Sequence, residues 1–230
     1  LLAGDLQIAP RPTMQDFERI EANESTRVAS SIGNRIVYFG LNYGMEPFKN
    51  RKVRQALNYA VDQAEINDVY LNGTGEVLGS ALPSTVPGFD ATIKPYPYDP
   101  DRAKALLKEA GYGSGFKTKI EAVPEWMIAG TEIVEAVINY LQQVGIQADF
   151  QVFDAGTMSG RITRRKSGPI YTLSWGGNST FDADSYLESL FGKGAWSCNE
   201  MPEIDKLVAA GRQTTDQDER VAIYQQACAI

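Results

Sequence analysis

The chain has 230 residues, 43% of them hydrophobic and 22% charged, and a formal net charge of −7. A chain this long can bury a sizeable core, which indicates a globular protein of one large domain or two small ones. The acidic surface, with no Lys/Arg cluster among aromatic residues, excludes nucleic acid as a partner, and no apolar run of about 18 residues predicts a membrane span.

The residue types that support most hydrolytic and metal chemistry are scarce. Histidine is absent, which removes Ser-His-Asp and Cys-His catalysis and the commonest metal ligand. Cys198 and Cys228 lack the spacing of a zinc site. We therefore expect no cofactor and no metal. The two thiols either form a disulfide or remain free, and the sequence leaves both possibilities open.

The first third of the chain begins with a hairpin signal. Two strand-like runs, residues 26–32 and 35–41, flank a Gly-Asn pair that is typical of a tight turn. A helix follows, with Asn50 as its N-cap and an apolar stripe at helical spacing. Asp62 and the glutamate three residues later form a capping box that begins a short second helix. Residues 79–97, rich in Pro and Gly, predict a long surface loop.

The next helix has the clearest boundaries. Asp99 is its N-cap, Pro100 fits the first helical position, and Gly111 supplies a left-handed stop. The pattern then alternates strand and helix through residues 117–123, 131–144, 146–152, 156–165 and 170–175. Strands joined by helical crossovers lie parallel, so the sequence predicts an α/β fold with a layered sheet and helices packed on it. Two helices, residues 202–211 and 216–229, complete the chain, the second capped by Thr215.

The segment after the last strand has the composition of a pocket for a polar ligand. In open α/β sheets, ligands collect beyond the carboxyl ends of the strands. Trp175 and Phe181 provide flat apolar walls, and Asn178 and Asp182 provide hydrogen-bonding groups. Gly177, one of two adjacent glycines, lets the backbone approach a ligand closely. We predict that these residues bind the ligand.

Other interpretations of this region remain open. Asp182 or Asp184 can simply cap the following helix. The same two carboxylates can be the acid and base of a hydrolase, although side chains two residues apart at a helix start point in different directions. Arg161 lies on the preceding basic helix, and its guanidinium suits a ligand carboxylate, so we include it among the candidate ligand-binding residues.

Several segments, in order, resemble the family of periplasmic oligopeptide-, dipeptide- and nickel-binding proteins, the bacterial extracellular solute-binding proteins of family 5. The most specific are residues 47–62 (PFKNRKVRQALNYAVD) and 98–112 (YDPDRAKALLKEAGY). Weaker matches are residues 2–9, 38–42, 144–146, 203–207 and 218–224.

The resemblance implies a periplasmic-binding-protein-like lobe and not an enzyme. Residues 1–42 would be a connecting segment with the first strands from the hinge side, and residues 43–230 the C-terminal lobe, with the N-terminal lobe absent from this chain. Such a protein binds a peptide or similar small polar solute between two lobes and delivers it to the permease subunits of an ABC importer. We expect a monomer, periplasmic or lipid-anchored outside the cell.

The resemblance also bears on the ligand. In peptide-binding members, an aspartate close behind the tryptophan strand pairs with the amino terminus of the peptide. Alignment without a gap puts Asn178 in that position, and a short gap puts Asp182 there. Nickel complexes, sugars, opines and modified peptides stay open as ligands. The alternative functions are a carboxylate-dependent hydrolase that uses Asp182 and Asp184, and a purely structural or partner-binding domain.

Overall fold

The computed structural model describes residues 2–10, 12, 16–176, 180–194, 196, 198 and 201–230. Its elements, in chain order, are α1 (Phe17–Glu21), β1 (Arg35–Leu41), α2 (Arg51–Ala60), α3 (Gln63–Leu71), α4 (Pro100–Glu109), β2 (Phe116–Ala122), the 3₁₀ turn η2 (Pro124–Trp126), α5 (Gly130–Gln143), β3 (Ile146–Val152), α6 (Ala155–Thr163), β4 (Ile170–Gly176), α7 (Ala183–Leu190), α8 (Pro202–Gln213) and α9 (Gln217–Cys228). Within these ranges, no helix combines the length and the apolar run that crossing a bilayer requires.

The four strands form one mixed sheet in the order β1-β4-β2-β3. As predicted, the strands connected by helical crossovers are parallel: β2 pairs in parallel with both β3 and β4. β1 is the exception, because it lies antiparallel to β4 at the edge of the sheet. The α/β architecture predicted from the alternating pattern is therefore confirmed.

The predicted hairpin is wrong. Residues 26–32 form no strand, and β1 pairs instead with β4, from Arg35 opposite Gly176 to Leu41 opposite Ile170. The physical reason is burial, since residues 26–32 are mostly exposed, whereas β1 buries one face against the core. The long-range pairing is close, because a Cβ at Gly40 would meet the ring of Tyr171 at 2.3 Å.

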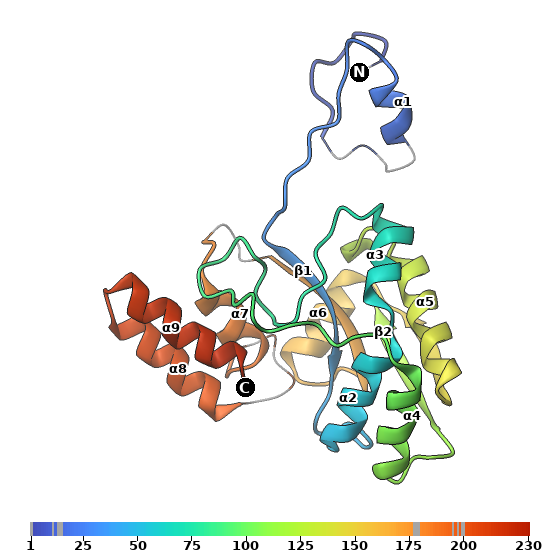
Figure 1. The fold of residues 1–230 in the computed structure, drawn as a ribbon, viewed down its shortest axis with the longest axis vertical. Coiled ribbons are helices and arrows are strands. Elements are labelled where there is room, and N and C mark those ends of the chain that lie inside the picture. The colour runs from blue at the N-terminus through green and yellow to red at the C-terminus, as the bar shows by residue number, and fades with distance from the viewer. Residues whose placement is uncertain are drawn as a thin grey trace.

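Two hydrophobic clusters pack on opposite faces of the sheet. Neighbouring residues of β4 divide between them: Ile170 joins the first cluster, and Tyr171 joins the second. The first cluster is covered by α2, α4 and α5, and the second by α6, α7, α8 and α9. Figure 1 shows the α7–α9 group and the α2, α4 and α5 group on different sides of the strands.

The local signals for helix starts perform well. Asn50, Asp62 and Asp99 each accept a hydrogen bond from a backbone N–H in the first turn of α2, α3 and α4, as predicted. The predicted cap Thr215 is wrong by one residue, because Asp216 caps α9 and accepts from two backbone N–H groups at 2.9 and 3.0 Å. A carboxylate oxygen can accept both bonds at once, which favours the aspartate.

The amino-terminal part stands apart from this body. Figure 1 shows α1 and its flanking chain separated from the sheet, with an extended segment that leads into β1. Residues 79–97, the predicted long loop, contain no helix or strand and lie over the α7 side of the molecule. The strand β1 therefore marks the point at which the chain enters the α/β body.

Candidate functional site

The strand directions bring one end of each of the four strands to the same side of the sheet. Because β2, β3 and β4 are parallel and β1 is antiparallel, the carboxyl ends of the first three lie at the same edge as the start of β1. Arg35 pairs with Gly176 and Ile36 with Trp175 at this edge. We call it the ligand edge. The segment predicted to bind ligand therefore begins where the amino-terminal part of the chain enters the sheet.

Trp175 is half-buried at the ligand edge. Its ring lies 5.6 Å from that of Trp196, with an interplanar angle of 57°. Among the described residues, its buried indole N–H has no hydrogen-bond partner. An indole N–H usually finds a partner when it is buried, so this donor is an exception. Trp196 was not singled out from the sequence, because a lone tryptophan in a loop has no periodic signal.

Two of the predicted site residues, Gly177 and Asn178, lie outside the described residues. Phe181 is half-exposed and has a φ of +49°, the left-handed region that a phenylalanine rarely adopts. It lines a cavity of about 200 Å³ together with Asp182, Arg220 and Tyr224. The structure therefore brings Phe181 and Asp182 together at one cavity.

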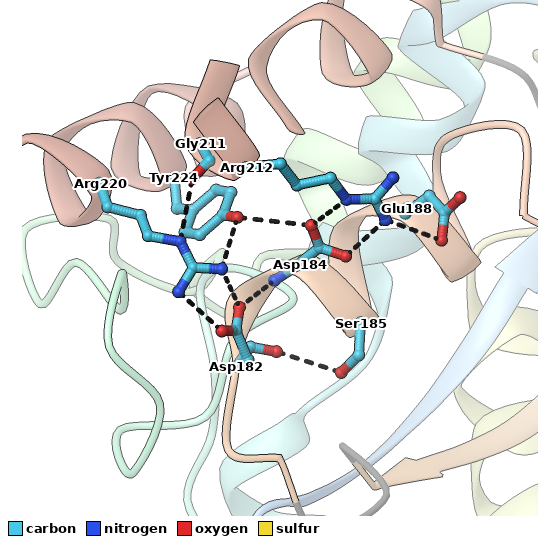
Figure 2. A network of polar contacts seen from close by, with 8 residues as sticks. All are labelled: Asp182, Asp184, Ser185, Glu188, Gly211, Arg212, Arg220 and Tyr224. Carbon is cyan, nitrogen blue, oxygen red and sulfur yellow. Dashed lines mark hydrogen bonds and ion pairs between the residues drawn. The ribbon is translucent and has the colours of Figure 1, made fainter. Parts of the chain in front are cut away.

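Asp182 caps α7, as the simpler interpretation predicted. Its Oδ1 accepts the backbone N–H of Asp184 at 2.9 Å. Arg220 of α9 reaches both carboxylate oxygens, with Nη1 2.8 Å from Oδ2 and Nη2 3.1 Å from Oδ1 (Figure 2). The same guanidinium donates to the Gly211 carbonyl and to the Tyr224 hydroxyl. A ligand ammonium at Asp182 would thus compete with an arginine that is already in place.

Asp184 is equally well neutralised. Arg212 of α8 donates to its two carboxylate oxygens at 2.6 and 2.7 Å, and its guanidinium also lies 3.4 Å from Glu188 (Figure 2). These contacts hold the pKa of Arg212 above its ordinary value, chiefly through the bond to Asp184. Asp182 and Asp184 therefore tie α7 to the terminal helices, and this arrangement gives the hydrolase alternative no support.

Arg161 is held by a buried carboxylate. Its Nη2 and Nε donate to the two carboxylate oxygens of Glu121 on β2, the second at 3.2 Å, and its guanidinium lies 4.9 Å from the centre of the Phe153 ring. Glu121 is only 3% exposed and also accepts the backbone N–H of Gly168 at 2.7 Å. Arg161 therefore balances a buried charge. The sequence signal for this ion pair is Glu121, an acidic residue within the otherwise apolar end of a strand.

Arg35 is a cation at the ligand edge that the sequence did not single out. Its Nη1 donates to the Ser174 hydroxyl at 2.9 Å, and the residue is exposed. Ser174 directly precedes Trp175, so the guanidinium and the indole ring lie at the same end of the sheet but on opposite faces of it. Arginine recognises carboxylates well because its donors form a planar fork. An arginine at the start of a strand does not indicate a ligand-binding role in the sequence, because its position near Trp175 follows only from the pairing of β1 with β4.

The two cysteines are free thiols in the structure. Cys198 Sγ lies 2.7 Å from the Ser167 hydroxyl. Burial raises the pKa of Cys228 to about 11. Across the described part of the chain, no group of three or more Cys, Asp or Glu side chains has the arrangement of a metal site.

Comparison with known proteins gives a consistent result. The model of the family described as "Bacterial extracellular solute-binding proteins, family 5 Middle" matches residues 1–198. Di/tripeptide-binding protein 1 of Pseudomonas aeruginosa is 31% identical over 99% of this chain and 43% of that protein. Heme-binding protein A of Haemophilus influenzae is 29% identical over all of this chain and 43% of that protein.

Solved structures agree with the fold. HbpA2 from Haemophilus parasuis is similar with a TM-score of 0.89 and 28% identity, over 99% of this chain and 46% of that one. The periplasmic binding protein DppA from Helicobacter pylori, in complex with the peptide STSA, gives a TM-score of 0.85 and 26% identity, over 95% of this chain and 43% of that one. The chain thus spans less than half the length of these proteins.

Proposed function

Because the chain belongs to the bacterial extracellular solute-binding proteins of family 5, we propose that it forms part of the substrate-binding component of an ABC-type importer. In this proposal the protein binds a peptide or a similar small polar solute and delivers it to the permease subunits in the membrane. It acts outside the cytoplasm, in the periplasm or attached to a lipid anchor, as a monomer and without enzymatic activity of its own.

The solute lies between two lobes, of which this chain supplies one. Residues 43–230 form that lobe, and residues 1–42 connect it to the preceding lobe and contribute the first strand. The fraction of the relatives that the chain covers leaves room for a second lobe of similar size. A cleft between two lobes removes most of a small solute from water, which a single surface cannot do.

The observation that carries this proposal is the composition of the ligand edge. The extended segment enters the sheet at Arg35, which pairs with Gly176, the residue after Trp175. The exposed guanidinium of Arg35 is a donor for a solute's carbonyl or carboxylate groups, and the half-buried indole ring of Trp175 offers an aromatic surface at the same end of the sheet. Phe181 supplies an exposed apolar ring at the following loop. A solute that reaches both the guanidinium and the aromatic rings needs hydrogen-bonding groups together with apolar groups, as a peptide has.

We further propose that Gly177 and Asn178 contact the solute and that Asp182 acts indirectly. The carboxylate of Asp182 is engaged by Arg220 and by the first turn of α7. It therefore fixes the end of the ligand-binding segment. Arg161 is held by Glu121 and supports the segment from the α6 side. Direct contact with the solute is then made by Trp175, Asn178 and Phe181.

A thermal-shift screen of the full-length protein tests this function. Dipeptides, tripeptides, glutathione, opines and oligosaccharides are added separately, and the melting temperature is recorded. A solute at about 100 times its Kd stabilises the folded state by about 2.7 kcal/mol, which shifts the melting temperature by a few degrees. At least one of these polar solutes should give that shift. A protein that responds to none of them, while it turns over a hydrolase substrate, would contradict the proposal.

A further inference from the structure

A second cavity, of about 330 Å³, lies between α3 and α5. The helix α5 packs against the first hydrophobic cluster, whereas Phe181 and Asp182 lead into α7, which packs against the second. The cavity is therefore on the opposite side of the sheet from the end of the ligand-binding segment, and the proposed import function does not use it. Its polar and aromatic lining consists of Glu65, Tyr70, Tyr98, Asn139, Tyr140 and Gln143.

The aromatic rings of the cavity are held in a fixed arrangement. Tyr98 and Tyr140 meet edge to face, with ring centres 5.4 Å apart and an interplanar angle of 71°. The Tyr98 hydroxyl donates to Gln143 Oε1 at 3.3 Å, and the Tyr140 hydroxyl donates to Glu65 Oε2. With both hydroxyls engaged, the two rings are fixed in position at the cavity that they line. Tyr98 is 39% exposed, so a ligand can reach it.

The cavity carries negative potential. Glu65 is exposed and contributes a carboxylate, whose Oε2 accepts the Tyr140 hydroxyl. Burial, followed by the bond to Glu65, raises the pKa of Tyr140 well above its ordinary value, so this phenol stays protonated and continues to donate. Asp62, the cap of α3, adds a second negative charge near Tyr140. The faces of the tyrosine rings add the negative end of their quadrupoles.

This lining selects among ligand classes. An anion is disfavoured because the described lining residues include a carboxylate and no Lys or Arg. A bare metal ion needs several oxygen ligands, and the described residues form no such group here. A neutral apolar molecule would bury the carboxylate without compensation. An organic cation avoids all three difficulties, because its charge pairs with Glu65 and its carbon groups contact the tyrosine faces.

We propose that the cavity between α3 and α5 binds a small organic cation, a primary or quaternary ammonium compound, through the ring faces of Tyr98 and Tyr140 and the carboxylate of Glu65. The cavity has room for a compound of the size of choline. This site is separate from the ligand edge, so it can be occupied whether or not a solute lies between the two lobes.

Titration of the full-length protein with choline tests the proposal, followed by saturation-transfer NMR of the N-methyl protons. The comparison compound is 3,3-dimethyl-1-butanol, which has the same shape, the same nine methyl protons and no charge. Choline should bind saturably below about 20 mM, and at least about tenfold more tightly than the neutral compound. Equal affinities for the two compounds, or no saturation with choline, would overturn the proposal.

Variants locate the binding to this cavity. Tyr98→Leu removes a ring face and should weaken choline binding about fivefold. Glu65→Gln keeps the shape and removes the charge, with a loss of about the same size. The matched control is Tyr96→Leu, because Tyr96 is 38% exposed and also meets another tyrosine edge to face, but it does not line the cavity. If Tyr96→Leu and Tyr98→Leu change the affinity equally, or if neither changes it, choline binds elsewhere and the proposal is wrong.

Discussion

Arg220 of α9 holds both carboxylate oxygens of Asp182, the residue that caps α7, at 2.8 and 3.1 Å. The two residues are 38 positions apart in the chain, and their contact joins α9 to the start of α7. It lies at the end of the segment that follows β4. The Arg220 guanidinium therefore stabilises α7, together with the Arg212–Asp184 contact, and helps to position the proposed ligand-binding segment.

Replacing Arg220 by Met should destabilise the protein by about 2 kcal/mol, because Asp182 loses its partner and the Gly211 carbonyl loses a donor. Urea unfolding followed by circular dichroism measures the change. The control is Arg102→Met, whose partner Glu109 lies 3.8 Å away and whose side chain is 49% exposed. That change should cost less than about 0.5 kcal/mol. Equal losses in the two variants would show that the Asp182 contact is no stronger than a surface ion pair.

Replacing Arg161 by Met should destabilise the protein by about 3 kcal/mol, because Glu121 is buried and would be left without its charge partner. The double variant Glu121→Gln, Arg161→Met should recover part of this loss, since no unpaired charge remains. If Arg161 supports the fold and does not contact the solute, the double variant keeps solute affinity within about threefold. A much larger loss of affinity in the stable double variant would place Arg161 at the ligand.

Cys228 should react slowly with iodoacetamide in the folded protein. Burial raises its pKa from 9.0 to about 11, so at pH 9 the folded thiolate fraction is about 50-fold below that of an unfolded chain. The neutral thiol is favoured on folding. Its contribution to stability is complete below pH 9 and is lost as the pH rises toward 11.

The alkylation rate is measured by mass spectrometry in a Cys198→Ser variant, folded and in urea, between pH 8 and 11. Equal rates in the two states at pH 9 would contradict the raised pKa. In the unsubstituted protein without reductant, both cysteines should be alkylated in urea, because both are free thiols. Protection of both until a reductant is added would reveal a disulfide.

Asn178→Asp should improve the binding of peptides with a free amino terminus, if Asn178 occupies the position of the ammonium-binding aspartate. A carboxylate and an ammonium attract by a few kcal/mol at an effective dielectric constant of about 20. One hydrogen bond from the ammonium to the amide of Asn178 contributes only about 1 kcal/mol net. Titration with a dipeptide and its amino-acetylated form measures this, and acetylation should remove the gain. Unchanged binding of both compounds would place Asn178 outside contact with the ligand.

The features that the sequence predicted correctly are local. Asp99 and Pro100 determine the start of α4 within one turn, and the alternation of strand and helix determines the parallel part of the sheet. The position of Trp175 at a strand end followed from the same pattern. The cap signals are complete within about ten residues, and the alternation needs only the order of the elements along residues 117–175, so neither requires a known tertiary contact.

The features that the sequence did not predict depend on distant pairs. The partner of β1 is β4, and a Gly-Asn pair beside β1 favours the local hairpin that the chain does not form. The roles of Arg161 and Asp182 are set by Glu121 and Arg220, each about 40 residues away. Charged side chains select partners by proximity in space, which a linear pattern does not contain.

The central claim is that a polar solute binds at the ligand edge, against Trp175 and Arg35. Calorimetric titration of the full-length protein with the solute found by thermal shift, before and after Trp175→Ala and Arg35→Met, tests it most directly. Each variant should weaken binding at least about tenfold, and each should retain a cooperative unfolding transition. Wild-type affinity in both folded variants would contradict the claim and place the solute elsewhere.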